Sequence, residues 1–381
     1  MQRDIFTDEH ELFRSQMRRF AEAELEPKVA EWNANGMSDR ESWKRCGEEG
    51  FLGPNAPEEY GGAGADFLYS AIVMEELSRI RAHGLMVSLH SDICMPYITS
   101  FGNEAQKQKF LPGAISGDML LGIGMTEPGT GSDLASIQTR AIRDGDHYVL
   151  DGAKTFISNG QIADLFIVVA KTDPEVDPPH RGISLLLVEA STPGFQRGRK
   201  LEKIGLKGQD TSELFFENCR VPAENLLGHE GSGFKMLMQK LQQERLCIAV
   251  ASMASCRRSL DDTLDYVKQR RAFGQPIGSF QNTQFKMAEL STEVEVGQAF
   301  VDKLLPAHVR GEDIVSEVSM AKWWTTDLQK KLTSECLQLH GGYGFMDEYP
   351  ISADYNDAAV QSIYAGTNEI MKVIIARRLG L

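Results

Sequence analysis

The feature that most constrains this chain is its hydrophobic pattern, which changes twice along the sequence. Apolar residues recur at helical spacing from residue 7 to about 120. They gather into short runs between about 121 and 230, and the helical spacing then returns and holds to the end. We therefore predict an α+β multidomain fold, with an N-terminal α-helical domain (1–120), a middle antiparallel β-domain (121–230) and a C-terminal four-helix bundle (231–381).

Local signals refine this outline. Thr7 is a candidate N-cap for the first helix, and a later helical segment, 104–111, is expected to end before Pro112. The apolar runs of the middle part, such as 166–169, are too short for core helices, and no long helical pattern separates them, which favours a sandwich or barrel. The helices of the bundle are predicted near residues 234–271, 280–309, 312–339 and 354–379.

Composition and charge exclude several classes of function. The chain has 381 residues with 42% hydrophobic and 25% charged side chains, and its net charge of −14 would repel phosphate backbones, so we expect no nucleic acid partner. No apolar run is long enough to span a bilayer, and we expect no membrane insertion. The six scattered cysteines lack metal-ligand spacing, which predicts buried, reduced thiols and no metal site. The start of the chain lacks the features of a signal or transit peptide, which predicts a cytoplasmic protein, or a mitochondrial matrix protein if a transit peptide has been removed.

Three glycine-containing segments are candidate binding loops. Segment 125–133, Met-Thr-Glu-Pro-Gly-Thr-Gly-Ser-Asp, lets the backbone approach a ligand, but it has neither a Walker lysine nor the GxGxxG spacing. Segment 338–345 has three glycines in four positions, more than a helix C-cap requires. Segment 364–370 places Gly366 and a capping Thr367 before the last helix, whose N-terminus attracts negative charge. Taken alone, each segment also fits a plain turn, helix connection or cap.

Glu244 is the most informative single residue. It lies at helical spacing within an apolar seam formed by Leu237, Leu241, Ile248 and Ala251. Desolvation there would raise the pKa of the carboxyl toward neutrality, which suits a general base. The alternative is a salt bridge with the adjacent Arg245.

Taken together, these segments resemble the acyl-CoA dehydrogenase family of flavoenzymes over essentially the whole chain. Segment 125–133, continued by Leu-Ala-Ser, is similar to the first signature of that family. Segment 338–345, continued to Glu348 and Asp357, is similar to the second. The resemblance implies a noncovalent FAD between the β-domain and the bundle, with a neighbouring subunit closing over the adenosine, in a homotetramer.

The resemblance also assigns residues to FAD by position. Those that would meet the flavin from the β-domain are Met125, Thr126, Gly131, Ser132, Phe156 and Ser158. The family often has Trp where Phe156 stands, so ring stacking is kept but an indole donor is absent. Contacts made across the dimer would come from Arg270, Phe273 and Gln281, and those from the other side from Gln338, Gly341 and Gly342. Thr367 and Glu369 would complete the pyrophosphate end.

Two departures from the family pattern bear on mechanism. Many members carry the catalytic glutamate directly before Gly-Thr near the C-terminus, where this chain has Ala365, which cannot take a proton. The long-chain and isovaleryl subgroups carry the base on a bundle helix just before an arginine, and segment 243–246, Gln-Glu-Arg-Leu, matches that arrangement. The resemblance therefore implies that Glu244 is catalytic. The second departure is Ala353, where the signature usually has Lys or Arg.

The implied reaction is FAD-dependent α,β-dehydrogenation of a medium/long-chain or branched acyl-CoA to trans-2-enoyl-CoA, with electrons passed to an electron-transferring flavoprotein. Such a step belongs to fatty acid β-oxidation. Residues implied to bind the substrate are Ser132, Gln242, Arg245, Tyr364, Ala365 and Gly366, the amide of Ala365 facing the thioester carbonyl with a ribityl hydroxyl of FAD. The motifs favour the long-chain subgroup. Isovaleryl-CoA or terpenoid acyl-CoA dehydrogenation, an oxidase, and a catalytically silent acyl-CoA-binding paralogue are the alternatives.

Overall fold

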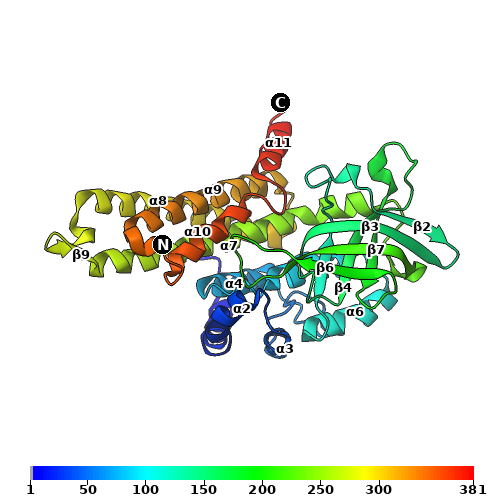
Figure 1. Ribbon diagram of the computed structural model, residues 1–381, viewed down its shortest axis with the longest axis horizontal. Coiled ribbons are helices and arrows are strands. Elements are labelled where there is room, and N and C mark those ends of the chain that lie inside the picture. Colours follow the sequence, from blue (N-terminus) through cyan, green and yellow to red (C-terminus); the bar gives the residue numbers. More distant parts are fainter. Residues whose placement is uncertain (1–2) are drawn as a thin grey trace.

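The computed structural model describes residues 3–381, so the first two residues of the predicted N-terminal domain lie outside the described range. The first part is helical, as predicted (Figure 1). Its helices are α1 (Asp8–Phe20), α2 (Val29–Asn35), α3 (Arg40–Glu48), α4 (Phe67–Arg79), α5 (Met95–Phe101) and α6 (Glu104–Ser116). Thr7 caps α1, because its side chain accepts a hydrogen bond from the amide of His10. A π-helical turn, Leu89–Cys94, runs directly into α5.

The prediction that a helix ends before Pro112 is wrong, because α6 continues through this proline to Ser116. A proline inside a helix removes one backbone hydrogen bond and strains the preceding turn. Leu111, Ala114 and Ile115 are buried on either side of it in a core shared with the β-sheet. Packing of this face outweighs the local cost, which a reading of the linear sequence does not reveal.

The middle part forms one eight-stranded sheet. Its strands are β1 (Leu121–Gly124), β2 (Arg140–Asp144), β3 (His147–Ser158), β4 (Leu165–Lys171), β5 (Ile183–Glu189), β6 (Phe195–Lys200), β7 (Thr211–Pro222) and β8 (Leu226–Leu227). They follow the order β6-β7-β3-β2-β4-β5-β8, and β1 also pairs with β4. The pairing is antiparallel as predicted, except that β1 and β2 each run parallel to β4.

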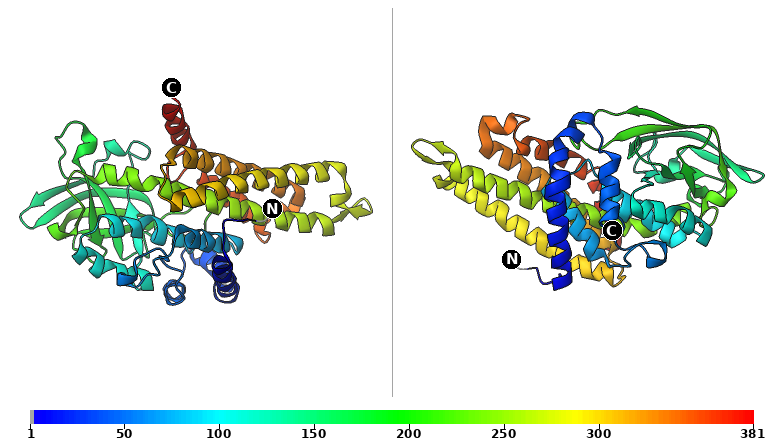
Figure 2. Two further views of the ribbon diagram at one scale, coloured as in Figure 1. Left: turned by 180° about the vertical axis from the view of Figure 1, so that it is seen from behind. Right: turned by 90° about the horizontal axis from the view of Figure 1, so that it is seen from below.

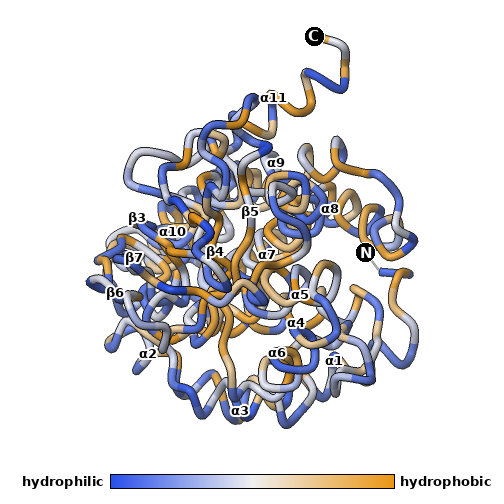
Figure 3. The backbone as a smooth tube through the Cα atoms, turned by 90° about the vertical axis from the view of Figure 1, so that its right-hand side faces the viewer, coloured by the Kyte–Doolittle hydropathy of each residue, from blue (hydrophilic) through white to orange (hydrophobic). Residues whose placement is uncertain are grey.

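The apolar runs of this sheet are continuous because two cores share them. In β4, Ile167 and Val169 pack into a core that includes α5 and α6, whereas Phe166 and Val168 pack into a second core within the sheet. Successive side chains of a strand point to opposite faces, so a strand covered on both faces needs apolar residues throughout. Figure 3 shows this distribution, with hydrophobic segments gathered in the interior around α4, α5, α7 and β5.

The last part is the helical bundle. It contains α7 (Gly233–Gln269), α8 (Gln281–Val309), α9 (Val315–His340) and α10 (Pro350–Gln361), followed by α11 (Asn368–Arg378). A short hairpin of β9 (Arg271–Ala272) and β10 (Gln275–Pro276) joins α7 to α8 at the end of the bundle farthest from the sheet (Figures 1 and 2). The single helix predicted at 354–379 is wrong. It is two helices, and α11 projects away from the bundle.

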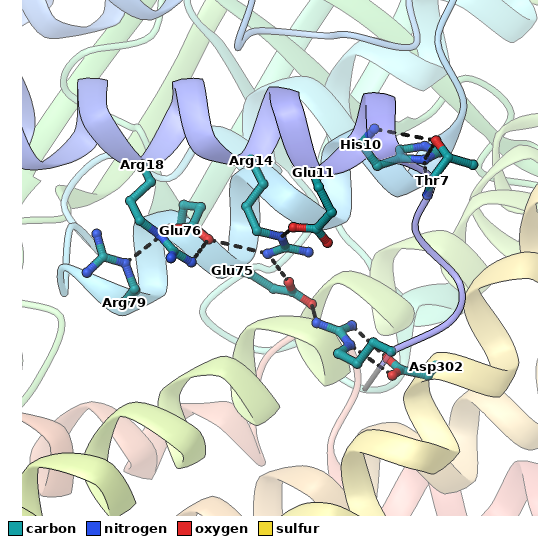
Figure 4. A network of polar contacts seen from close by, with 10 residues as sticks. Thr7, His10, Glu11, Arg14, Arg18, Glu75, Glu76, Arg79 and Asp302 are labelled. Carbon is teal, nitrogen blue, oxygen red and sulfur yellow. Dashed lines mark hydrogen bonds and ion pairs between the residues drawn. The ribbon is translucent and has the colours of Figure 1, made fainter. Parts of the chain in front are cut away.

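A charged network joins the start of the chain to the bundle (Figure 4). Arg14 and Arg18 of α1 and Arg79 of α4 converge on Glu76, which is buried. Burial would raise the pKa of Glu76, but its hydrogen bonds and ion pairs with these arginines hold it below 4.5. Arg3 also forms an ion pair with Glu75 of α4 and donates two hydrogen bonds, of 2.6 and 2.8 Å, to Asp302 of α8. These contacts extend the network to the bundle.

The predicted domain boundaries at residues 120 and 230 stay predictions. The structure begins β1 at Leu121 and α7 at Gly233. All six cysteines are buried and unpaired with one another, as expected. Within residues 3–381, no helix has the length and apolar character needed to cross a membrane.

Candidate active site

Glu244 lies in the N-terminal third of α7 and is only 3% exposed. The hydroxyl of Tyr97, on α5, donates a hydrogen bond of 2.8 Å to its Oε1 atom. Burial raises the pKa of Glu244 from 4.5 to about 7, although the Tyr97 hydrogen bond and the charges of Arg245 and Lys240 act in the opposite direction. A carboxyl with this pKa takes up and releases a proton near neutral pH.

The burial of Glu244 has a broader cause than the seam predicted from its spacing. Leu237 and Ile248 of that seam are buried, whereas Leu241 and Ala251 are half-buried. The helix is instead enclosed on all sides from Glu244 to Val250, because α4, α5, α8 and α9 pack around it. The predicted environment is therefore present, and tertiary packing rather than one helix face produces it.

Arg245 is buried and does not form the salt bridge considered above. Within residues 3–381, no ion pair joins it to Glu244, and its Nε atom is fully enclosed without a hydrogen-bond partner. Its guanidinium lies against the α10–α11 connection, since a methyl group added at Gly366 would lie 3.9 Å from Nη2. Burial lowers the pKa of Arg245. Nε is therefore a buried donor whose hydrogen bond is not made within the described residues.

The connection between α10 and α11 has an unusual backbone. After α10 ends at Gln361, Ala365 and Gly366 both have positive φ, 52° and 88°, and they lead the chain into α11. Thr367 caps α11, as predicted, by accepting a hydrogen bond of 3.3 Å from the amide of Ile370. Lys322 of α9 supports this connection from inside the bundle, because its Nζ donates to the Gly366 carbonyl at 2.7 Å.

Sequence reasoning missed Lys322. The side chain is fully buried, and burial lowers its pKa to about 8, with the charge of Arg245 acting in the same direction. Its second hydrogen bond, 3.1 Å long, reaches Oδ1 of Asn368. A lysine on a long helix usually marks a solvated face, so only the three-dimensional packing reveals its role beneath the connection.

Two other predicted substrate residues are engaged by the protein itself. The Tyr364 hydroxyl donates a hydrogen bond of 2.6 Å to Gln361. Gln242 supports the connection between α8 and α9, donating to the Glu312 carbonyl and accepting from the Ile314 amide, both at 3.0 Å. The substrate-binding role of both residues stays a prediction, and for Gln242 the structure offers a purely supporting role instead.

The glycine-rich loop at 125–133 rests on a buried ion pair that sequence reasoning also missed. Nζ of Lys154, on β3, lies 2.8 Å from Glu127 and also donates to the Met125 carbonyl. Glu127 accepts further hydrogen bonds from the amides of Gln138 and Thr139, at 2.5 and 3.0 Å. The pair is buried, and it holds the loop against β3 from both ends. Glu127 is a charged residue between β1 and the glycines of the loop, and it is the sequence signal that could have revealed this ion pair.

The surface of this loop fits a closely bound cofactor. A Cβ atom added at Gly131 would meet no atom of the chain within 4 Å, and its φ is not positive, so neither packing nor conformation requires glycine there. Ser132 is exposed beside it. Phe156 of β3 is 68% exposed, with φ of 57°, where the pairing of β3 with β7 shifts register. Open backbone beside a projecting aromatic ring suits a flat ring system such as a flavin.

The remaining residues of this group are half-buried at the ends of the neighbouring strands β1 and β3. Met125 and Thr126 follow β1, and Ser158 ends β3. The amide of Thr155 donates to the Thr126 carbonyl at 2.9 Å, which joins the loop to the strand that carries Phe156. The structure therefore places Thr126 beside the strand that carries Phe156 and Ser158.

A second group of predicted FAD residues lies at the opposite end of the molecule. Arg270, Gly341 and Gly342 line a cavity of 460 Å³. Gln338 lines a neighbouring cavity of 910 Å³. Phe273 is 95% exposed in the β9–β10 hairpin, and Gln281 is exposed at the start of α8. Figures 1 and 2 show this hairpin at one end of the long axis and the sheet at the other, so one chain does not bring the two groups together.

Comparison with protein families identifies all three parts of the chain. The N-terminal, middle and C-terminal domains of acyl-CoA dehydrogenase match residues 7–118, 122–219 and 231–380. The chain belongs to the acyl-CoA dehydrogenase family. This confirms the resemblance drawn from the two signatures, together with the predicted fold class. The protein is an FAD-dependent enzyme.

Individual relatives can be aligned with nearly the whole of this chain. The mitochondrial long-chain specific acyl-CoA dehydrogenase of Mus musculus is 48% identical over 99% of this chain and 88% of that protein. A solved structure of acyl-CoA dehydrogenase from Geobacillus kaustophilus is 52% identical, covers 100% of both chains and superposes with a TM-score of 0.99. Another, of an acyl-CoA dehydrogenase complexed with FAD from Bacillus anthracis, is 32% identical over 98% of this chain and 67% of that one, with a TM-score of 0.92.

Proposed function

We propose that Glu244 is the general base of this acyl-CoA dehydrogenase and removes the α-proton of an acyl-CoA thioester, so that the product is a trans-2-enoyl-CoA. The observation that carries the proposal is the buried carboxyl held by Tyr97, with its pKa raised to about 7. An α-proton of a thioester is weakly acidic, and a base that is ionised but poorly solvated at neutral pH is suited to remove it. Ala365 has no group that accepts a proton, so the alternative base position is vacant in this chain.

Negative charge that develops on the thioester oxygen needs donors placed in advance. We assign one to the backbone amide of Ala365, in the connection that Lys322 supports through the Gly366 carbonyl. The positive φ of Ala365 and Gly366 turns this stretch of backbone out of helical hydrogen bonding, which leaves an amide available. The enclosed guanidinium of Arg245 beside it adds positive charge.

The FAD-binding residues support a site shared between subunits. Met125, Thr126, Ser132 and Phe156 would hold the flavin from the β-domain, and Arg270, Gln281, Gly341 and Gly342 would hold FAD from the far end of another subunit. This arrangement follows because the two groups lie at opposite ends of one chain. The chemistry that FAD supplies when bound is acceptance of the β-hydrogen as a hydride. We propose a homotetramer that passes the electrons to an electron-transferring flavoprotein in fatty acid β-oxidation, in the cytoplasm or, for an imported protein, the mitochondrial matrix.

For the substrate, we propose acyl chains longer than isovaleryl. The support is the 48% identity to a long-chain specific relative over nearly the whole chain, together with the Gln-Glu-Arg-Leu segment at 243–246. An isovaleryl-CoA or terpenoid acyl-CoA dehydrogenase is the alternative within the family.

The deciding experiment is anaerobic stopped-flow reduction of the flavin, followed as loss of its yellow absorbance, in wild type and Glu244→Gln. The amide keeps the volume of the carboxyl but cannot accept a proton, so we expect FAD and substrate to bind while reduction slows by about 10²–10⁴-fold. Reduction within a few-fold of wild type would remove Glu244 as the base. The wild type is tested with butyryl-, isovaleryl-, octanoyl- and lauroyl-CoA. Reduction confined to the first two would overturn the proposed chain length, and no reduction with any of them would favour a silent paralogue.

A further inference from the structure

The two carboxylate oxygens of Glu244 have different surroundings. Oε1 accepts the hydrogen bond from Tyr97, at 2.8 Å. Within residues 3–381 no group donates to Oε2, and this atom, unlike Nε of Arg245, is not fully enclosed. One oxygen is therefore held by the protein, and the other is free to meet a substrate.

We propose that Tyr97 is a positioning residue for the reaction, and that its hydroxyl holds Oε1 of Glu244 so that Oε2 faces the α-proton. This inference rests on the proposed role of Glu244 as the base. A base acts only from a well-defined position, and a single charge-assisted hydrogen bond restricts both the rotation of the carboxylate and its depth in the site.

The position of Tyr97 is itself well determined. Tyr97 is fully buried in the first turn of α5, directly after the π-helical turn Leu89–Cys94. Gln243, next to Glu244 on α7, donates a hydrogen bond of 2.7 Å to the carbonyl of Asp92 within that turn. The π-helical turn is thus joined to α7 through the backbone of Asp92, and α5, which follows it directly, is joined to α7 through Tyr97. Single π-helical turns often occur where a helix must redirect a side chain.

The electrostatics keep the hydrogen bond in one direction. Burial and the charge of Glu244 raise the pKa of Tyr97 well above 10, so the hydroxyl remains a donor at any working pH. The other charged groups acting on Glu244 are Lys240 and Arg245, both on α7. The charge of Glu244 also raises the pKa values of two thiols, those of Cys94 in the π-helical turn and Cys247 on α7. Among the described residues, Tyr97 alone hydrogen-bonds to the carboxylate.

The test is Tyr97→Phe, which removes the donor and keeps the ring. The rate of anaerobic flavin reduction by saturating lauroyl-CoA is measured as a function of pH. Without the hydrogen bond, the ionised form of Glu244 loses support, so we expect the acid limb of the profile to move upward by about 1–2 pH units. We also expect the plateau above the new limb to fall by about 10-fold, because the carboxylate is no longer aimed. A merely structural role for Tyr97 would lower Tm and leave the limb in place, and that result would overturn the inference.

The matched control is Tyr60→Phe. Tyr60 is also buried, and its hydroxyl also donates to a glutamate, Glu104, at 2.9 Å, but it forms no hydrogen bond with Glu244. Its removal should leave the acid limb unchanged. An equal upward shift in this variant would show a general effect of losing a buried tyrosine and would overturn the inference. If Tyr97→Phe does not fold, Tyr97→Met, which is flexible and lacks a donor, replaces it with the same expected shift.

A second readout does not depend on turnover. The pH dependence of Tm is compared between Tyr97→Phe and Tyr97→Phe/Glu244→Gln. We expect the difference to keep growing above pH 7, because the pKa of Glu244 in the first of these proteins is higher than in wild type. A difference in Tm that stops growing at about pH 7, as expected for the wild-type pKa of Glu244, would contradict the inference. Failure of the base itself is recognised separately, since Glu244→Gln would then reduce flavin normally whatever Tyr97→Phe does.

Discussion

At the scale of single residues, the site depends on polar groups held in an apolar interior. Glu244 is the clearest case, because removal from water raises its pKa and its neighbours lower it again by smaller amounts. Two lysines, Lys322 and Lys154, are buried as well, and each binds oxygen atoms of a loop. The chemistry of the protein is therefore set by where a few charges are enclosed, as is usual for perturbed groups at enzyme sites.

The raised pKa of Glu244 predicts a specific pH dependence of stability. The folded protein holds this proton more tightly than the unfolded chain does, so Glu244 destabilises the fold progressively as pH rises from 4.5 to about 7, by about 3 kcal/mol in all. Glu244→Gln cannot ionise. Its Tm relative to wild type should therefore increase across this interval and stay constant above it, as measured by calorimetry.

Glu104→Gln is the control for that measurement. Glu104 is exposed, and its hydrogen bonds with Gln108 and Tyr60 hold its pKa below 4.5, so this variant should show no gain over the same interval. A constant Tm difference for Glu244→Gln from about pH 5 to pH 8 would mean that Glu244 ionises as an ordinary exposed carboxyl.

At the scale of elements, loops are held by buried polar contacts. The loop after β1 is fixed to β3 by Glu127 and Lys154, and the α10–α11 connection is fixed to α9 by Lys322. In both places the backbone carries the predicted binding groups, while the enclosed charge only fixes their position. A buried ion pair contributes little net stability, but removing one partner leaves an unpaired charge and is costly.

Lys154→Met should therefore destabilise the protein by about 3–5 kcal/mol and weaken FAD retention, because Glu127 loses its cation and the loop at 125–133 loses its anchor. Flavin absorbance per protein after gel filtration, together with Tm, measures both effects. Arg220→Met, which breaks an exposed pair with Asp144 on the same sheet, should change stability by less than about 1 kcal/mol. Full FAD content and an unchanged Tm in Lys154→Met would contradict an anchoring role.

At the scale of the whole molecule, the length of the chain's fold separates the two groups of residues predicted to bind FAD. The β-domain group and the group around Arg270 lie at opposite ends of the long axis, on either side of the bundle (Figure 2). In the proposed site, one FAD spans both groups, and two chains pair with opposite orientation to form it. Such a pair is isologous, so each interface completes two sites at once.

Arg270→Ala should consequently weaken FAD retention and subunit assembly together. The guanidinium of Arg270 lies 5.2 Å from the centre of the Tyr343 ring, at the edge of the 460 Å³ cavity, and the substitution removes this charge. Analytical ultracentrifugation combined with flavin absorbance measures both properties. Arg199→Ala, at an exposed position of β6, serves as the control and should alter neither. A stable monomer of Arg270→Ala that retains full FAD would exclude the shared site.

Much of this protein was predictable from local pattern. Helical spacing and short apolar runs are properties of the linear chain, so the order of helical, β and helical parts follows from the sequence, as do the Thr7 and Thr367 caps. The position of Glu244 among apolar residues could likewise be predicted from spacing. The family could be recognised because each of its two signatures is long and contiguous, and the matches to its three domains confirm it.

What only the tertiary structure decided concerns contacts between distant segments. Tyr97 and Glu244 are separated by 147 positions, and Lys322 and Gly366 by 44, so no local pattern joins them. Packing also carries α6 through Pro112, against the preference of the local sequence. Spacing determines which face of an element is apolar, whereas the free energy of burying that face against a particular neighbour determines which polar groups are enclosed together.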